Sequence, residues 1–353
     1  MIDTLDIFYD FPNRYEYNTC YKVIDEISRS YKRQALHKDK SNNTKKYITT
    51  VFSSVGLLRI AFFKTDYRHT IQITLQPIRL ILPNARSWLA KESHFSKICN
   101  RFDGVISGFN RQCQRNILPP IQTWRVKRID YAINIETEYA NEYLRLFHSG
   151  KIPYGFTLQH FEGSYYLTSK NGNINFYNKS EQVRNKSEQV RTKPRNDLDD
   201  YINELVYESE GLLRLEFQCS NKYIQHLKEH YRLEDTTLPY LWNARIAIQE
   251  LKNRVKSILG KKDFFTYDIC VEKLSQKYKN RTLSLCSQII RTLRDSPGAN
   301  LHDIEALLPT SARKQFPLLL HKIRKAGVNP IPLEVTGNHT IRTLPNPYNL
   351  LCA

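Results

Sequence analysis

Apolar and polar residues alternate along several short stretches of the chain, and a period of two predicts β-strands. The clearest stretch is Trp124 to Ile135, WRVKRIDYAINI, in which charged and apolar side chains take turns. Tyr47 to Phe63, Thr70 to Leu82 and Gly211 to Ser220 are rich in Ile, Val, Leu, Thr and Phe, and each is expected to be a strand. The segment Tyr154 to Lys179 predicts a meander of three short strands.

Helical spacing of apolar residues lies between these strands. A helix is expected from Ala85 to Arg115, with a break near Asp103-Gly104, and others from Thr137 to Phe147 and from Pro239 to Leu259. Strands and helices in this order are compatible with an α+β protein.

The last third of the chain has a different pattern. Helical runs Leu301 to Leu308 and Ala312 to Ala326 precede a possible hairpin from Leu333 to Leu344 that turns at Gly337-Asn338. Helix, turn, basic helix and hairpin is the order of a winged helix, provided that Pro317 lies in the first turn of its helix. The alternative is a generic helical tail that packs on the core.

Length and these patterns predict three parts for the 353 residues. They are an N-terminal α+β part (1–120), a central part (121–260) and a basic C-terminal helical or winged-helix-like part (261–353).

Composition indicates an anionic partner. Lys and Arg number 53 against 35 Asp and Glu, a formal net charge of +18, and a surplus of this size is typical of proteins that bind nucleic acid. No apolar run approaches the roughly 18 residues of a membrane-spanning helix, and residues 1–10 do not resemble a signal peptide, so we expect a cytoplasmic protein that does not bind membranes. The seven scattered cysteines contain no CxxC pair and are expected to be reduced.

Common catalytic motifs are missing. The chain has no GxSxG, Walker A, GxGxxG or HExxH sequence, which argues against ATP use. His226 and His230 in HLKEH have the spacing of zinc ligands, but without an obvious third ligand a solvated helix face is the preferred interpretation.

Three expected strand segments carry charged or phenolic groups beside apolar ones. They are Arg128-Ile129-Asp130, Phe176-Tyr177-Asn178-Lys179 and Arg214-Leu215-Glu216. Charges at inward strand positions are costly unless they are paired or bound to a metal. Two carboxylates that converge beside a tyrosine would form an oxygen-rich site suited to Mg²⁺ or Mn²⁺. A phenol there could attack a phosphodiester while a lysine offsets the developing charge. Taken singly, Tyr177 is more simply a hydrogen-bonded strand tyrosine, the two acids are salt-bridge partners, and Lys179 is a surface side chain.

The combination RIDYAINI (128–135), INFYNKSEQ (174–182) and LLRLEFQC (212–219) resembles the rolling-circle replication initiators. The resemblance is to the gene II and gene X replication proteins of filamentous phages, and more distantly to plasmid initiators. It implies an RRM-like antiparallel sheet related to HUH endonucleases, without their histidine pair. It also implies a metal-dependent nicking and strand-transfer endonuclease in a bacterial cytosol.

By this resemblance Tyr177 matches the nucleophile that joins to a 5′ phosphate, and Lys179 the lysine that steadies phosphate charge. Asp130 and Glu216 match the metal-binding acids, and Glu181 is the expected third ligand or base. Asn134, Gln182 and Gln218 depart from the family, because relatives often carry acids at these places, and a weaker metal site is expected.

Partners implied by the resemblance are origin DNA, as a single strand or hairpin at the nick site, and a host helicase and DNA polymerase. Two alternatives remain: a non-catalytic, sequence-specific DNA-binding regulator, and a tyrosine recombinase that works without metal. The basic residues expected to contact DNA are Arg128, Arg214, Arg313, Lys314, Lys322, Arg324 and Lys325.

Overall fold

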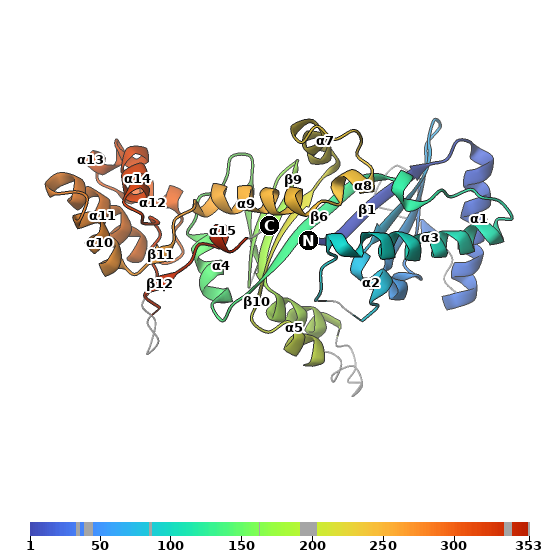
Figure 1. Ribbon diagram of the computed structural model, residues 1–353, viewed down its shortest axis with the longest axis horizontal. Helices are drawn as coiled ribbons and strands as arrows, with labels where there is room; N and C mark the ends of the chain where they lie inside the picture. The colour runs from blue at the N-terminus through green and yellow to red at the C-terminus, as the bar shows by residue number, and fades with distance from the viewer. Residues whose placement is uncertain are drawn as a thin grey trace. The chain divides into compact units, whose positions relative to one another are not determined.

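The computed structural model describes residues 1–32, 36–38, 45–84, 87–161, 163–190, 203–334 and 341–351 (Figure 1). The expected α+β class with a large antiparallel sheet is confirmed. Ten strands follow the order β2-β3-β4-β5-β1-β6-β10-β9-β8-β7. The chain also divides into two compact units, which are described separately: Met1–Ile133 with Lys170–Asn173 and Glu216–Ala247, and Asn134–Ser169 with Ile174–Leu215 and Ile248–Ala353.

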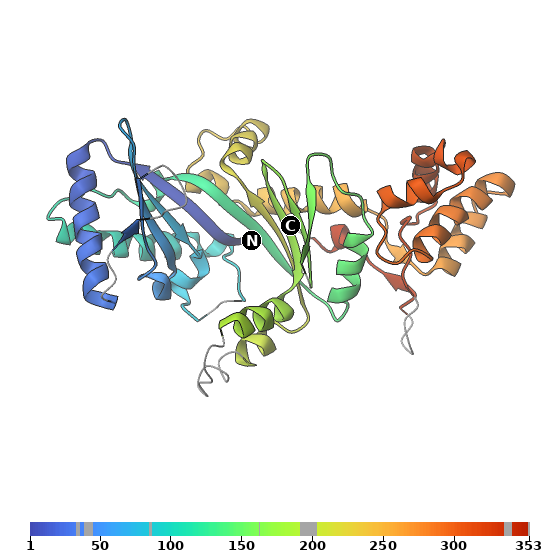
Figure 2. The same cartoon turned by 180° about the vertical axis from the view of Figure 1, so that it is seen from behind.

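The first unit is a sheet with helices on one side. Its central strand β1 (Ile2–Asp10) pairs antiparallel with β5 (His69–Leu75) and β6 (Arg125–Glu136). Leu5 and Ile7 are 0% exposed, because they face the helices that contact β1 and β5. These helices lie together on one side of the strands (Figures 1 and 2). The further elements of this unit are β2 (His37–Lys38), β3 (Lys45–Thr49), β4 (Leu57–Lys64), α1 (Arg14–Lys32), α2 (Pro77–Ile81), α3 (Phe95–Gln112), α7 (Asn221–His230) and α8 (Leu238–Leu241).

The second unit joins short strands to helices around an aromatic core. Phe147 of helix α4 (Ala140–His148) lies 4.5 Å from Phe176 of β9 (Gly172–Asn178) between ring centroids. Tyr165 of β8 (Ser164–Thr168) stacks on both rings. Further elements are β7 (Thr157–Phe161), α5 (Lys179–Val190), β10 (Leu212–Cys219) and α9 (Ala244–Leu259); β6, β9, β10 and α9 have residues in both units.

The C-terminal part of the second unit is helical. Helix α11 (Asn280–Arg294) contacts α10 (Tyr267–Ser275), α12 (Leu301–Leu307) and α14 (Phe316–Lys325). Two-residue strands β11 (Phe264–Phe265) and β12 (Thr343–Leu344) pair antiparallel. The remaining elements are α13 (Thr310–Arg313) and α15 (Pro347–Leu350).

Several strand and helix predictions need correction. Tyr47 to Phe63 is two strands, β3 and β4, because a turn and a 3-10 helix at Ser53–Val55 interrupt it. The strand expected to reach Leu82 ends at Leu75, since Pro77 starts α2. The helix expected over 85–115 is α3, which begins at Phe95 and runs unbroken through Asp103-Gly104.

Two further corrections concern the C-terminal half. The helix expected over 239–259 is divided into α8 and α9 by Trp242 and Asn243. The turn of the expected Leu333–Leu344 hairpin lies outside the described residues. On either side of it, Leu333 bridges Thr266 in parallel and β12 pairs with β11, so the described residues flank one common strand instead of pairing as a hairpin. Pro317 lies in the first turn of α14, where a missing N–H costs nothing.

Among the described residues, no helix is both long enough and apolar enough to span a bilayer. The three-part domain division stays a prediction.

Candidate functional site

The predicted site residues lie on the polar face of their strands. In β10, Leu213, Leu215 and Phe217 are completely buried, and alternation places Arg214 and Glu216 on the other face. In β6, the buried Ile129 and Tyr131 likewise leave Arg128 and Asp130 on the opposite face. The two-residue period therefore separates the hydrocarbon core from a charged face.

Arg128, Asp130 and Glu216 form what we call the carboxylate cluster. Arg128 donates from Nε to Asp130 Oδ1 at 2.8 Å and from Nη2 to Oδ2 at 2.5 Å. Asp130 is 1% and Glu216 5% exposed. Burial raises the pKa of Asp130 well above its ordinary value; the hydrogen bonds from Arg128 lower it, and the neighbouring charge of Glu216 raises it again. The structure thus brings the two predicted acids into electrostatic contact.

Polar partners surround this cluster where acids were expected from the family pattern. Gln218 donates to Glu216 Oε1 at 2.8 Å, and Asn173 donates to Gln218 Oε1 at 3.2 Å. In the second unit, Arg214 is 0% exposed and donates from Nε to Asn134 Oδ1 at 2.8 Å. Asn134 and Gln218, two of the three positions where acids were expected, thus hydrogen-bond to the guanidinium and the carboxylate beside them.

Tyr177 and Lys179 belong to the second unit. Ile174 and Phe176 of β9 face the aromatic core, so alternation turns Tyr177 toward the other, polar face of the strand. Tyr177 is 4% exposed, and Lys179 Nζ lies 5.6 Å from the centroid of its ring. Lys179 also donates to Gln182 Oε1 at 3.0 Å. The structure therefore joins the predicted nucleophile to the predicted lysine.

Glu181 has a different neighbourhood. Its Oε1 accepts a hydrogen bond from Asn141 of α4 at 3.0 Å. A Cβ on Gly163 would lie 2.5 Å from Glu181 Oε2, so a larger residue would displace this carboxylate, and the φ of +67° also favours glycine there. Glu181 is thus a half-exposed acid held at the start of α5.

The donor set of the carboxylate cluster suits a hard divalent ion. Mg²⁺ is commonly held by one or two carboxylates together with water, and Asp130 and Glu216 provide two. Arg128, however, occupies both oxygens of Asp130 and would have to move aside. Within the described ranges no group of three or more His, Cys, Asp or Glu side chains could hold a metal ion, and His226 and His230 of α7 complete no such group. The metal role of Asp130, Glu216 and Glu181 stays a prediction.

The basic residues expected to bind DNA differ in their environments. Arg313 donates to the carbonyls of Glu305, Ala306 and Leu308, and so closes the end of α12. Burial lowers the pKa of Arg324. Lys314 and Lys325 are exposed and Lys322 is half-exposed, so these three offer the accessible charge near α14.

The sequence patterns did not reveal a tyrosine that lies among lysines. Tyr348 of α15 has Lys261 Nζ at 4.9 Å and Lys252 Nζ at 5.6 Å from its ring centroid. The hydrogen bond with Lys261 lowers the pKa of Tyr348, and the charges of Lys261, Lys252 and Lys256 lower it further. The lysines lie about 90 positions away along the chain, so no local pattern could have indicated this group.

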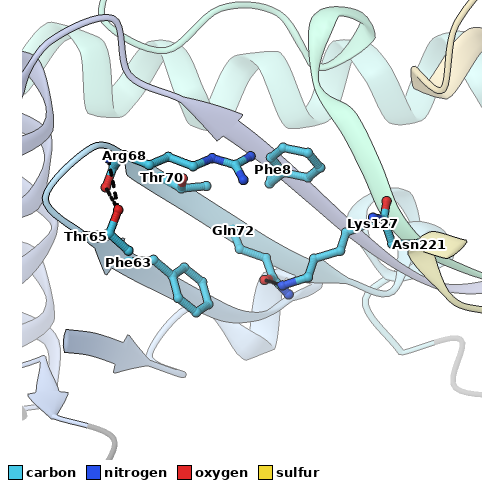
Figure 3. A pocket seen from close by; sticks show the side chains of 8 residues that line it. All are labelled: Phe8, Phe63, Thr65, Arg68, Thr70, Gln72, Lys127 and Asn221. Atoms are coloured by element: carbon cyan, nitrogen blue, oxygen red, sulfur yellow. Dashed lines mark hydrogen bonds between the residues drawn. The ribbon is translucent and has the colours of Figure 1, made fainter. Parts of the chain in front are cut away.

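A pocket on the first unit was also missed. Phe8, Phe63, Thr65, Arg68, Thr70, Gln72, Lys127 and Asn221 line a cavity of about 230 Å³, here called the Phe63 pocket (Figure 3). Its residues come from β1, β4, the β4–β5 turn, β5, β6 and α7, which only the folded sheet brings together.

Comparisons of the chain with protein families, with curated proteins and with solved structures found no match.

Proposed function

We propose that the chain is a rolling-circle DNA replication initiator: a strand-specific endonuclease and strand transferase of RRM-like, HUH-related fold. The proposal rests on one observation: the candidate catalytic side chains lie on the polar faces of their strands, opposite the apolar core. Buried Asp130 is paired with Arg128 and feels the charge of buried Glu216, and Lys179 lies over the Tyr177 ring. Buried ionisable clusters of this kind are more typical of reactive sites than of ordinary sheets.

The proposed chemistry is a phosphodiester exchange. The phenol oxygen of Tyr177 attacks the scissile phosphorus and loses its proton, a phosphotyrosyl bond forms to the 5′ phosphate, and the P–O3′ bond breaks. The leaving 3′ oxygen takes up a proton and becomes the hydroxyl that a host polymerase extends. Lys179 stabilises negative charge on the phosphoryl oxygens. The reverse exchange closes the displaced strand.

A bound Mg²⁺ or Mn²⁺ would supply Lewis-acid polarisation of the phosphate. Asp130 and Glu216 would hold it, with Glu181 as the remaining candidate ligand or base. With metal bound, Arg128 would be released from Asp130 and would contact the DNA backbone. Without metal, it pairs with Asp130. The accessible charge of Lys314, Lys322 and Lys325 in the basic C-terminal helical part would supply affinity for duplex origin DNA.

The test uses a labelled single-stranded origin oligonucleotide with Mn²⁺, and the readout is a covalent adduct on a denaturing gel. Wild-type protein should form the adduct, a chelator should prevent it, and Tyr177→Phe should abolish it. Peptide mapping of the adduct then identifies the nucleophile. An adduct on Tyr348, or on the 79% exposed Tyr207, would reassign it. Adduct formation that resists chelation would instead favour a tyrosine recombinase.

One observation favours the non-catalytic alternative. The fork between Arg128 and Asp130 is a complete ion pair of the kind that purely structural clusters contain. A regulator would bind origin duplex tightly yet neither nick supercoiled DNA nor form an adduct with any divalent metal. That combined result would replace the endonuclease proposal.

A further inference from the structure

The face of the first unit's sheet opposite helices α1, α2 and α3 carries aromatic, polar and charged side chains. Phe8 and Asp10 alternate with the buried Leu5 and Ile7 along β1, and Thr70 and Gln72 alternate with the buried Ile71 and Ile73 along β5. The first set therefore lies on the face opposite helices α1, α2 and α3. The Phe63 pocket opens on this face.

Aromatic rings and cations are interleaved in the pocket. Arg68 lies over the Phe8 ring at 5.3 Å, and Lys127 lies over the Phe63 ring at 5.3 Å (Figure 3). Lys46 approaches Phe63 at 5.4 Å. Each of these two rings is only half buried, so part of each remains accessible to a ligand.

A β-bulge directs Lys127 into the pocket. Asp6 pairs with Arg128 and the next residue, Ile7, pairs with Val126, which leaves Lys127 as the extra residue of β6. Its ammonium group donates to Gln72 Oε1 at 2.9 Å, across β1. In a regular strand Lys127 would pair with Ile7 and would point toward the helices. The bulge instead leaves Lys127 unpaired, so its side chain can reach the pocket on the opposite face.

Positive charge is concentrated at this place. Burial lowers the pKa of Lys127, and the nearby charges of Lys46, Arg59 and Arg68 lower it further, whereas Asp6 opposes them. Asp10 pairs with Arg68 at the pocket's edge. Cations that repel each other in this way gain from an anionic ligand.

The size and chemistry of the pocket select the ligand. Its volume, about 230 Å³, is below the roughly 300 to 1,000 Å³ of pockets that enclose small molecules, which suits one group of an extended chain. Exposed aromatic faces bind unpaired bases by stacking, and lysine and arginine bind the phosphates between them. The amide of Gln72 and the hydroxyl of Thr70 could hydrogen-bond a base edge. Paired bases in a duplex cannot stack on such rings.

We infer that the Phe63 pocket binds single-stranded DNA, with a base stacked on Phe63 or Phe8 and the adjoining phosphate at Lys127 and Arg68. The exposed Tyr67, in the turn beside Arg68, is placed to extend the stacking surface. This inference rests on the proposed function for the choice of DNA as ligand. It does not depend on which residue is the nucleophile.

The first experiment measures binding of full-length protein to a fluorescent oligothymidylate of about 15 nucleotides, by anisotropy. Phe63→Leu keeps apolar volume but removes the aromatic face, and it should weaken binding about tenfold. Lys127→Gln should weaken binding and reduce the slope of log K against log salt by about 0.7. The matched controls are Phe161→Leu, an exposed phenylalanine of the second unit, and Arg29→Gln on α1, and both should bind like wild type.

A second measurement does not depend on variant stability. Photocrosslinking of a bromodeoxyuridine oligonucleotide to wild-type protein should label Phe8, Phe63 or Tyr67, as identified by mass spectrometry. Wild-type affinity in folded Phe63→Leu and Lys127→Gln would overturn the inference, as would crosslinks confined to other regions. Equal binding of duplex, or full competition by polyglutamate, would also overturn it, because both would indicate charge attraction alone.

The two proposals can fail separately. Tyr177→Phe should retain oligothymidylate binding and the crosslinks while losing the covalent adduct. A protein that binds at the Phe63 pocket but never forms an adduct would refute the endonuclease proposal and leave this inference standing. A protein that forms the adduct with unaltered binding in the pocket variants would do the opposite.

Discussion

Two arginine–aspartate forks of nearly equal geometry behave in opposite ways in the first unit. Arg68 donates from Nε and Nη2 to the two oxygens of Asp10 at 2.7 Å each, and Arg128 holds Asp130 in the same manner. Asp10 has a side chain 35% exposed and Asp130 one only 1% exposed.

Their pKa values move in opposite directions. Partial burial raises the pKa of Asp10, but hydrogen bonds from Arg68 and Thr70 and the charges of Arg68 and Arg125 outweigh it, so the pKa is lowered. For Asp130, burial and the charge of Glu216 outweigh Arg128, so the pKa is raised. The arginine hydrogen bonds therefore favour the charged form of both carboxylates, but they outweigh the opposing effects only at Asp10. Depth and a second acid decide the difference.

The largest expected effect comes from removing each guanidinium. Breaking a buried pair by deleting one partner costs roughly 3 to 5 kcal/mol, and partial exposure of Arg128 with protonation of Asp130 reduces this to about 2 kcal/mol for Arg128→Met. Arg68→Met should cost less than about 1 kcal/mol, since exposed pairs contribute little. Urea unfolding at neutral pH measures both free energies of unfolding. Equal losses would show that the two forks do not differ as described.

The second prediction concerns the binding of a divalent metal ion by the two buried acids. If Asp130 and Glu216 bind Mn²⁺, a concentration ten times the dissociation constant adds about 1.4 kcal/mol to the free energy of unfolding. Thermal unfolding of wild-type protein should shift upward with Mn²⁺, while that of Glu216→Gln should not. Glu26→Gln, an exposed acid of α1, is the control and should follow wild type. No shift in wild type would remove the metal from the proposal.

The next prediction concerns the pH dependence of stability, for which we expect smaller changes in the free energy of unfolding. Because the folded pKa of Asp130 is raised, its charged form weakens the fold above that pKa, and the weakening disappears as pH falls below the unfolded value. Asp130→Asn should therefore be as stable as wild type or more stable at pH 7.5, with the gain shrinking toward acid.

Asp10→Asn should show the opposite trend. The lowered pKa of Asp10 contributes stability above the unfolded value, and this is lost as pH falls through the folded pKa. The variant should lose less than about 1 kcal/mol at pH 7.5 and approach wild type in acid. Denaturant unfolding at several pH values measures both variants, and parallel pH profiles would contradict the opposite shifts.

The smallest effect concerns the half-exposed phenol of Tyr348, whose pKa is lowered by hydrogen bonding and by neighbouring charges although desolvation opposes them. Lys261→Met should raise the pKa of Tyr348 by removing its hydrogen-bonding cation, without a measurable change in unfolding. Tyrosine-specific NMR titration would follow this shift, with Lys228→Met as a control, because Lys228 is not among the lysines that act on Tyr348. A Tyr348 titration unaffected by the substitution would show that the lysine cluster does not act on the phenol.

Local patterns predicted the strands that carry the candidate site. Alternation over Trp124 to Ile135 indicated β6, and Gly211 to Ser220 indicated β10, because one face of each is apolar. The partnership of Arg128 with Asp130 also follows from a spacing of two, which places both side chains on one face. The break between β3 and β4 was missed, since apolar residues continue through the turn at Val51 to Val55.

The sequence by itself determined which face of each strand is charged, since the period of two is a property of neighbouring residues. Only the tertiary structure decided the depth of Asp130 against that of Asp10, the bulge that directs Lys127, and the lysines around Tyr348. These features depend on strand register and on contacts between residues far apart in the chain. Burial summed over the whole sheet sets the register, and no short stretch of sequence contains that sum.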